Sequence, residues 1–313
     1  MTKKVYRVRN WPQYNKGLVS RGSLFIWFNK AHIQSAEGAH KNQAYSNALI
    51  ACALTIRQLF RLPYRATEGF LRSLIELHHL GIPTPDYSTL CRRSKGLKVN
   101  LNIKSTSQAR HILIDSTGVQ VVGEGEWKRL KHGESRCQVW KKLHIALDAD
   151  SLDILALDVT DSVRLDGNYL PGLVNQIDGP IGQITGDGAY DKQNCYETAL
   201  ERGAKPVFPP QHNAAVQRNK IKKNPALIPR DELIIRLNSA LDKEEELRIW
   251  KQENNYHRRS LVETNMSRLN AIFGDEMNAR TPENQYTDLA IRCSIVNKMN
   301  KLGLPKSNPV FFR

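Results

Sequence analysis

Three acidic residues that lie far apart in the sequence are the strongest candidates for chemistry in this chain. Asp115 ends the apolar segment "ILID", Asp187 follows another apolar segment in "TGDGAYD", and Glu263 lies in "YHRRSLVET". A carboxylate in an apolar strand is costly to bury unless a cation accompanies it. Magnesium prefers such hard oxygen ligands, and two ions about 4 Å apart can activate the attacking oxygen and stabilise the leaving oxygen of a phosphoryl transfer. The three acids therefore predict a site for two Mg²⁺ ions.

Two of these acids also have simpler explanations when each is taken alone. Asp115 could be an edge or strand-end residue exposed to water. Glu263 could form an ordinary ion pair with Arg259, four residues earlier on a helix, which is worth only a few tenths of a kcal/mol. The metal-site interpretation depends on all three acids coming together in the fold.

The motif "TGDGAYD" offers two candidates for the second acid. Asp187 follows the predicted strand directly, and Gly186 and Gly188 beside it allow backbone and substrate to approach closely. Asp191 lies four residues further on, where we expect it to cap the next helix. We therefore favour Asp187 as the second acid.

The chain that follows Ser107 has the apolar pattern of strands. Three runs predict consecutive antiparallel strands, and a short helix at 168–177 leads to a fourth strand; the strand runs are "HILIDSTGVQVVG", "KLHIALDA", "DILALDV" and "IGQITGDGAY". A further helix, "NCYETALERG", precedes "AKPVFPP". This order predicts a ribonuclease H-like α/β fold with a mixed sheet, in which the first and fourth strands are neighbours. Asp115 and Asp187 would then lie within metal-bridging reach.

A helical pattern places the third acid. At about 100° per residue, Tyr256, Arg259, Glu263 and Asn270 fall on one stripe, beside an apolar stripe made of Val262, Met266, Leu269 and Phe273. We expect this helix to pack its apolar side against the sheet and to present Glu263 at the rim, one turn after Arg259.

The first hundred residues have helical periodicity. We predict one helix within 43–60, a second capped at Thr67 and a third capped at Thr84, the last of which ends in a basic cluster that includes Arg92 and Arg93. Three short helices with a basic end favour a DNA-contacting bundle of the helix-turn-helix type. A subdomain for dimerisation or packing is the alternative.

The charge of the chain indicates a polyanionic partner. A formal net charge of +15 favours nucleic acid over a membrane surface. The stretch between Glu201 and Asp231 contains no acid and carries several basic residues, among them Lys220, Lys222 and Lys223. It is a candidate phosphate-contacting loop, and a solvated tract is the alternative.

The remaining composition excludes several classes of protein. The five cysteines are widely spaced without a C-x-x-C pair, which favours reduced cytosolic thiols, and the longest apolar stretch is too short to span a bilayer. The motifs of P-loop ATPases, Rossmann dehydrogenases, zinc proteases of the H-E-x-x-H type and α/β-hydrolases are missing. We expect a cytoplasmic, nucleoid-associated protein.

In their order and spacing, five segments of this chain resemble bacterial insertion-sequence transposases of the DDE class, specifically the insertion sequence family five group. The segments are "RGSLFIWF", "LIDSTGVQV", "WKKLHIALD", "GDGAYD" and "YHRRSLVET". The signature of the related enzymes has Tyr, two residues, Arg, three residues, Glu, six residues and then Lys. Tyr256, Arg259 and Glu263 match it, whereas the last position here is Asn270, which cannot supply the charge of a lysine.

The resemblance implies a DNA recombination enzyme. It implies that the protein binds the terminal inverted repeats of its own element, cleaves there and joins the freed 3′ ends to target DNA, with Mg²⁺ or, as a substitute, Mn²⁺. It also implies that Tyr256 and Arg259 hold DNA beside the metals. We add Arg258 and the basic residues named above as predicted DNA contacts, and we expect a homodimer in the complex with double-stranded DNA.

These observations predict two regions. Residues 1–106 form a helical region for DNA binding and dimerisation, and residues 107–313 form a ribonuclease H-like catalytic domain with a basic insertion at about 205–230. One alternative is a regulator that occupies the inverted repeats without cutting, although a non-enzyme has no need of the three acids. Another is a ribonuclease H-like nuclease that cleaves without strand transfer, which a strand-transfer assay distinguishes.

Overall fold

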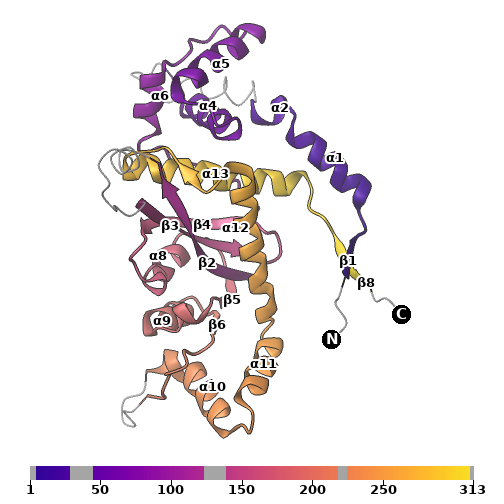
Figure 1. Ribbon diagram of the computed structural model, residues 1–313, viewed down its shortest axis with the longest axis vertical. Helices are drawn as coiled ribbons and strands as arrows, with labels where there is room; N and C mark the ends of the chain where they lie inside the picture. The colour runs from indigo at the N-terminus through magenta and orange to yellow at the C-terminus, as the bar shows by residue number, and fades with distance from the viewer. Residues whose placement is uncertain (1–4, 29–44, 123–138, 218–223, 311–313) are drawn as a thin grey trace, which may run out of the picture. The chain divides into compact units, whose positions relative to one another are not determined.

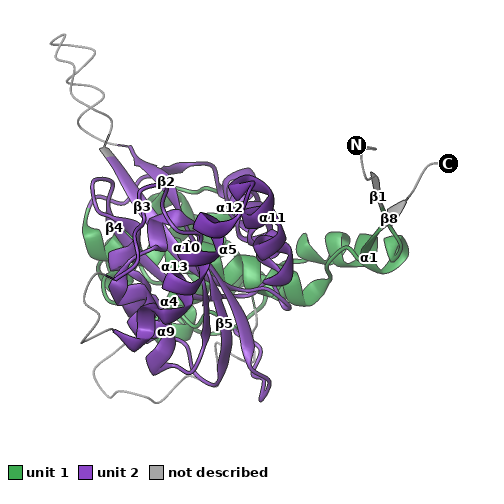
Figure 2. Cartoon of the chain, turned by 90° about the horizontal axis from the view of Figure 1, so that it is seen from below, with its two compact units in different colours: residues 1–102, 281–313 green, residues 103–280 purple. Residues whose placement is uncertain are grey.

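The computed structural model describes residues 5–28, 45–122, 139–217 and 224–310. The chain divides into two compact units, which Figure 2 shows in different colours. Unit 1 contains residues 1–102 and 281–313, and unit 2 contains residues 103–280. The predicted boundary at residue 106 lies close to the first division, but the last 33 residues group with the N-terminal helices rather than with the predicted catalytic domain.

Unit 2 is built on one mixed sheet with the order β4-β3-β2-β5-β6 (Figure 1). Its strands are β2 (Arg110–Val121), β3 (Val139–Asp148), β4 (Ile154–Asp161), β5 (Ile181–Thr185) and β6 (Lys205–Val207). Strand β3 runs antiparallel to both β2 and β4, whereas β5 runs parallel to β2 and β6 runs parallel to β5. A short strand, β7 (Glu276–Met277), also pairs with β2. The predicted adjacency of the first and fourth strands is confirmed.

The two faces of β2 have different partners. Ile112 and Ile114 belong to a buried cluster with the short helix α8 (Leu170–Val174) and with α9 (Gln193–Glu201). Because side chains alternate along a strand, Asp115 points to the opposite face. Helix α12 (Ser260–Phe273) packs against β2 through its buried apolar residues, as predicted, namely Val262, Met266, Leu269 and Phe273.

In the described part of the chain, two helices and two 3-10 turns connect the sheet to α12. Helix α10 (Ile228–Ser239), preceded by the turn η3 (Pro225–Leu227), pairs with α11 (Lys243–Glu253), and the 3-10 turn η4 (Tyr256–Arg259) follows. Arg236 of α10 joins the pair through ion pairs with Glu246 and, at 2.7 Å, with Glu253. The first half of the Tyr-Arg-Glu signature therefore lies on a tight turn at the start of α12. Two more 3-10 turns, η1 (Asp166–Asn168) and η2 (Gly188–Tyr190), precede α8 and α9.

Unit 1 is a helical bundle with a two-stranded ribbon. Its helices are α1 (Trp11–Arg21), α2 (Leu24–Trp27), α4 (Asn47–Leu59), α5 (Tyr64–Leu77), α6 (Tyr87–Ser94) and the long α13 (Pro282–Leu302). The ribbon pairs β1 (Val5–Val8) with β8 (Ser307–Val310). A buried ion pair of 2.9 Å between Arg57 and Asp288 joins α4 to α13.

Two predicted helix caps are wrong. Thr67 lies inside α5, where its hydroxyl donates to the Pro63 carbonyl at 3.0 Å, so the helix already starts at Tyr64. Helix α6 is capped by Asp86, which accepts from the Thr89 amide at 2.7 Å, and not by Thr84. In both places a threonine hydroxyl marked the expected start of the helix. The helix starts elsewhere, because a side-chain cap depends on which free backbone amides lie within its reach.

Among the helices in the described part of the chain, none is long and apolar enough to cross a bilayer.

Candidate active site

Strand β2 fixes the first acid. Asp115 follows the fully buried run that ends at Ile114, and its side chain keeps 17% of its surface exposed. Its Oδ1 accepts from the amide of Ser116 at 2.9 Å. The carboxylate is therefore held close to the backbone at the point where the interior of the sheet opens to the surface.

The end of β5 fixes the second acid. Asp187 caps the turn η2 by accepting from the Ala189 amide at 2.9 Å. The glycine before it is required by packing, because a Cβ on Gly186 would lie 2.6 Å from Cδ2 of Tyr190. The carboxylate of Asp187 is thus oriented by its own turn, which follows the strand paired with β2, the strand of Asp115.

Helix α12 carries the third acid in its first turn, and Arg259 links it to the first. Nη1 of Arg259 lies 2.6 Å from Oδ2 of Asp115, and its Nη2 donates to Oε1 of Glu263. The predicted pair between Arg259 and Glu263 exists, with Glu263 53% exposed at the rim. The sequence pattern did not predict the second contact, in which the same guanidinium reaches across to β2.

Electrostatics join the three acids to Tyr256. Burial raises the pKa of Asp115, and the charges of Asp187 and Glu263 raise it further, while the Ser116 amide and Arg259 oppose the shift. The pKa of Tyr256 is also raised, first by burial and further by the charges of Asp115, Asp187 and Glu263, while Arg259 opposes the shift. Tyr256 therefore stays a neutral phenol that can donate a hydrogen bond beside the acids.

The chemistry of these donors fits divalent cations. Three carboxylates supply hard oxygen ligands, and a cation, the Arg259 guanidinium, already bridges two of them. Within residues 5–28, 45–122, 139–217 and 224–310, no three His, Cys, Asp or Glu side chains are already grouped closely enough to hold a metal ion. Arg259 thus supplies the positive charge between Asp115 and Glu263 in this structure.

Asp191 has a structural role that differs from the predicted one. Helix α9 is capped at Lys192, and the carboxylate of Asp191 does not cap it. Instead Asp191 accepts from Nε of Arg230 at 2.6 Å, from the hydroxyl of Tyr196 at 3.1 Å and from the Gln211 amide at 3.0 Å. The prediction of a cap is wrong because Arg230, on α10, reaches the same carboxylate from a distant part of the chain.

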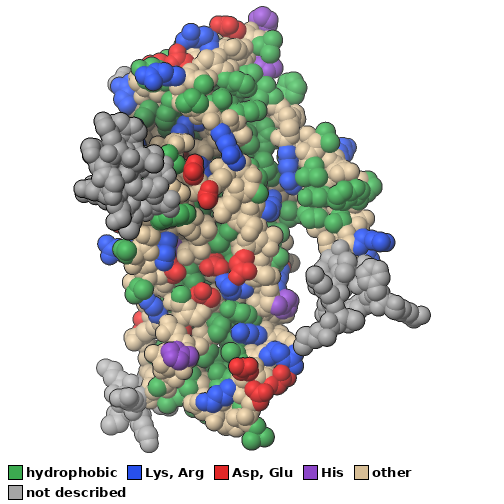
Figure 3. Space-filling model, viewed as in Figure 1, with side chains coloured by type: hydrophobic (Ala, Val, Ile, Leu, Met, Phe, Trp, Pro, Cys, Tyr) green, Lys and Arg blue, Asp and Glu red, His purple; other side chains and the backbone are tan. Residues whose placement is uncertain are grey.

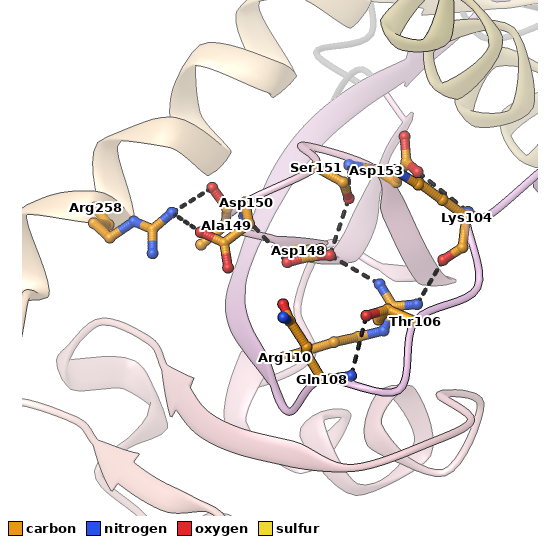
Figure 4. A network of polar contacts seen from close by, with 10 residues as sticks. All are labelled: Lys104, Thr106, Gln108, Arg110, Asp148, Ala149, Asp150, Ser151, Asp153 and Arg258. Carbon is orange, nitrogen blue, oxygen red and sulfur yellow. Dashed lines mark hydrogen bonds and ion pairs between the residues drawn. The ribbon is translucent and has the colours of Figure 1, made fainter.

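Arg258, a predicted DNA contact, is bound to the turn between β3 and β4. Its guanidinium donates to the carbonyl of Ala149 at 2.7 Å and to Asp150 at 2.6 Å, as Figure 4 shows. The same turn is held from the other side by Arg110, which pairs with Asp148 at 2.8 Å. Neighbouring arginines therefore have different partners: Arg258 holds a turn, and Arg259 holds the acids.

The other predicted DNA contacts lie away from the three acids in the sequence. In unit 1, Arg93 donates to the Tyr45 carbonyl at 3.1 Å and to Asn47 at 2.6 Å, while Arg92 contacts Thr89 at 3.2 Å within α6. The three lysines predicted in the basic insertion, Lys220, Lys222 and Lys223, lie outside the described residues.

Tyr190 is a further side chain at this site that sequence reasoning did not single out. It is only 1% exposed, and its hydroxyl has no hydrogen-bond partner among the described atoms of the protein. Its pKa is raised well above the usual value, first by burial and then by the charges of Asp115, Asp166 and Asp187. Its place in the "GDGAYD" motif was the signal that could have identified it.

On the face that Figure 3 shows, acidic side chains gather over the sheet of unit 2, with Lys and Arg side chains among them. The mixed sheet, with Asp115 on β2 and Asp187 just after the neighbouring β5, fits a ribonuclease H-like domain.

Comparison with known families agrees with this class. A family model described as a transposase DDE domain matches residues 106–298, and another with the same description matches residues 19–124. Since the first of these covers more than half of the chain, the protein belongs to the DDE-domain transposases. Among solved structures it is similar to the piggyBac transposase in a synaptic complex with hairpin DNA, with a TM-score of 0.41 and 10% identity over 95% of this chain and 76% of that chain.

Proposed function

We propose that this transposase serves a bacterial insertion sequence of the family five group. It binds the terminal inverted repeats of its element, cleaves the DNA ends and joins the 3′ ends to target DNA. One observation carries the proposal: Arg259 binds both Asp115 of β2 and Glu263 of α12, and Asp187 caps the turn that follows the strand paired with β2. The family match supports the coarser part of the proposal, that the protein is a DDE-domain transposase.

The acids would hold two divalent ions, Mg²⁺ or Mn²⁺, whose chemistry is to neutralise phosphate charge and to activate the attacking oxygen. The residues of the chain then position the reacting groups. Asp187 is oriented by the Ala189 amide, and Asp115 by the Ser116 amide, so neither carboxylate has to be ordered when DNA arrives. Such preorganisation is the main contribution that a protein makes to phosphoryl transfer.

Tyr256 and Arg259 would hold the DNA beside the acids. The phenol of Tyr256 stays neutral and can donate to a phosphate oxygen, and the planar guanidinium of Arg259 matches two phosphate oxygens at once. Lys251 lies over the ring of Tyr256, with Nζ 5.3 Å from its centroid. Lys251 therefore brings to this turn a positive charge of the kind that the related signature has at the position of Asn270.

More distant contacts would hold the duplex. We assign this role to Arg258, to Arg92 and Arg93 of α6, and to the lysines of the basic insertion, Lys220, Lys222 and Lys223. Their combined charge suits the phosphate backbone. A homodimer that brings two element ends together completes the proposal.

The test uses the full-length protein with labelled DNA that carries the inverted ends found beside its gene, in the presence of Mg²⁺. We expect cleavage at the ends and joining of the 3′ ends to a target plasmid. Asp115→Ala should abolish both reactions and should leave end binding within about twofold of the wild type, since binding rests on phosphate contacts elsewhere. Loss of end binding in Asp115→Ala would contradict the role given to Asp115.

The same assay separates the alternatives. Cleavage without joined product in the wild type would identify a nuclease, and end binding without cleavage would identify a regulator. Either result would contradict the proposed function.

A further inference from the structure

Arg259 binds two of the three acids at the same time. Its Nη1 lies 2.6 Å from Oδ2 of Asp115, and its Nη2 donates to Oε1 of Glu263. The side chains of Arg259 and Asp115 are only 20% and 17% exposed, so this contact is partly shielded from water. An ion pair with such limited exposure is held more firmly than the exposed pair within a helix that the spacing alone predicts.

The bridge occupies oxygen atoms that a metal ion would use. Both oxygens of Asp115 have partners, because Oδ1 accepts from the Ser116 amide at 2.9 Å while Oδ2 accepts from Arg259. A divalent cation at Oδ2 would face the guanidinium at close range, and like charges at that distance repel strongly. The metal and Arg259 therefore compete for the same carboxylates.

A DNA phosphate is the natural next partner of the guanidinium once it leaves the carboxylates. Its planar fork binds carboxylate and phosphate by the same two-point geometry, so it cannot hold both acids and a phosphate equally well. A DNA phosphate beside the acids would accept the fork just when a metal ion has displaced it.

We propose that Arg259 is a built-in counter-cation that a divalent ion displaces from Asp115 and Glu263, and that the displaced guanidinium then binds a DNA phosphate. This inference rests on the proposed function, because it takes the three acids as the metal ligands. It means that each ligand favours the other: the metal frees Arg259 for DNA, and DNA draws Arg259 away from the acids. Such coupling is reciprocal.

Neighbouring Arg258 provides a matched control. It carries the same charge one residue away, but its partners are the Ala149 carbonyl and Asp150 in the turn between β3 and β4. Arg258→Ala removes a positive charge near the site without removing the bridge. Arg259→Lys does the reverse, because lysine keeps the charge but cannot join two carboxylates with a planar fork.

The first experiment measures the affinity of the DNA-free protein for Mn²⁺ alone, by the electron paramagnetic resonance signal of the free ion. We expect Arg259→Ala to bind Mn²⁺ about tenfold more tightly than the wild type, and Arg258→Ala to change the affinity less than about twofold. Arg259→Lys should tighten binding by an intermediate factor. An unchanged or weaker affinity in Arg259→Ala, or an equal gain in Arg258→Ala, would overturn the inference.

The design separates this inference from the proposed function. Wild-type Mn²⁺ binding that Asp115→Ala does not reduce would show that the acids are not the metal site, and the proposed function itself would fail. Mn²⁺ binding that Asp115→Ala reduces but that the Arg259 variants leave unchanged would overturn only the proposed displacement. Thermal unfolding of each variant verifies that it is folded. If Arg259→Ala does not fold, Arg259→Lys still tests the displacement.

The second experiment tests the coupling with a short mixed-sequence DNA duplex. Mn²⁺ should strengthen duplex binding by the wild type about fivefold or more, and by Arg259→Ala less than about twofold. An equal gain in both proteins would show that Arg259 does not carry the coupling.

Discussion

Two aspartates four residues apart in "GDGAYD" have separate tasks. Asp187 is half-buried, and its charge raises the pKa of Asp115 and of Tyr256. Asp191 is 1% exposed on its side chain and is committed to Arg230, Tyr196 and the Gln211 amide. We therefore assign chemistry to Asp187 and stability to Asp191. Separate substitutions of the two residues can distinguish these roles.

Asp187→Asn should therefore abolish DNA cleavage with little change in the free energy of unfolding. Asp191→Asn should lower that free energy by about 2 kcal/mol, because it weakens a buried charge-assisted bond to Arg230. Urea unfolding and end-cleavage assays of the two variants measure both effects. A stable, fully active Asp187→Asn protein would remove Asp187 from the site.

The removal of Arg230 should cost more than the removal of Asp191. Arg230→Met leaves the carboxylate of Asp191 buried without its cation, a change that typically costs about 3–5 kcal/mol. The double variant with Asp191→Asn should recover part of this loss. Chemical denaturation of the four proteins in the cycle gives the coupling energy, and additive effects would show that the two side chains act independently.

At the scale of elements, a polar cluster ties β2 and β5 to the end of α11, just before the turn that carries the signature. His111 lies 2.9 Å from Oγ1 of Thr185, and Gln183 donates both to His111 at 3.1 Å and to the Asn254 carbonyl at 2.9 Å. Burial, helped by the charge of Arg258, lowers the pKa of His111 to about 4. The cluster therefore holds a neutral imidazole between β2, which carries Asp115, and β5, which leads to Asp187.

This depressed pKa gives a pH dependence of stability. Between the ordinary pKa of 6.5 and about 4, the unfolded chain binds a proton that folded His111 does not. Its contribution is fully present above pH 6.5 and is lost as the pH falls through this window, by roughly 1–2 kcal/mol after allowance for solvent screening. His111→Gln should flatten the pH profile of the free energy of unfolding between pH 6.5 and 4. An unchanged slope would show that His111 titrates normally.

The elements of unit 2 were predictable because their patterns are local. A continuous apolar run with Asp115 at its end, and glycines around Asp187, define strands and their ends without knowledge of the partners. The bridge from Arg259 to Asp115 was not predictable, since it joins residues 144 positions apart and depends on how α12 lies against the sheet. The pair of Asp191 with Arg230 escaped prediction for the same reason.

At the scale of the whole chain, each unit has its own basis of stability. In unit 1 the last long helix, α13, packs with the earlier helices. Its Asp288 forms a buried ion pair with Arg57 of α4, and its Thr287 donates to the Ser94 carbonyl at 2.8 Å. The sequence of α13 could not reveal this grouping, because most of the helix is buried and a helical pattern does not identify the partner that buries it.

The net charge of +15 predicts a strong effect of salt on DNA binding. The logarithm of the binding constant should fall linearly with the logarithm of salt concentration, with a slope of about −0.9 for each phosphate contact on duplex DNA. Simultaneous replacement of Lys220, Lys222 and Lys223 by alanine should reduce the slope by about 3 if all three contact phosphates. Fluorescence anisotropy across a salt series measures the slope, and an unchanged slope would exclude the three lysines from the interface.

The central claim is that Asp115, Asp187 and Glu263 form one catalytic site. The most direct test is the single-turnover rate of DNA end cleavage with Mg²⁺ for Asp115→Asn, Asp187→Asn, Glu263→Gln and the triple variant. Groups that act as a unit lose activity together, so each single variant should be as inactive as the triple variant. A single variant that cleaves at close to the wild-type rate would contradict the claim.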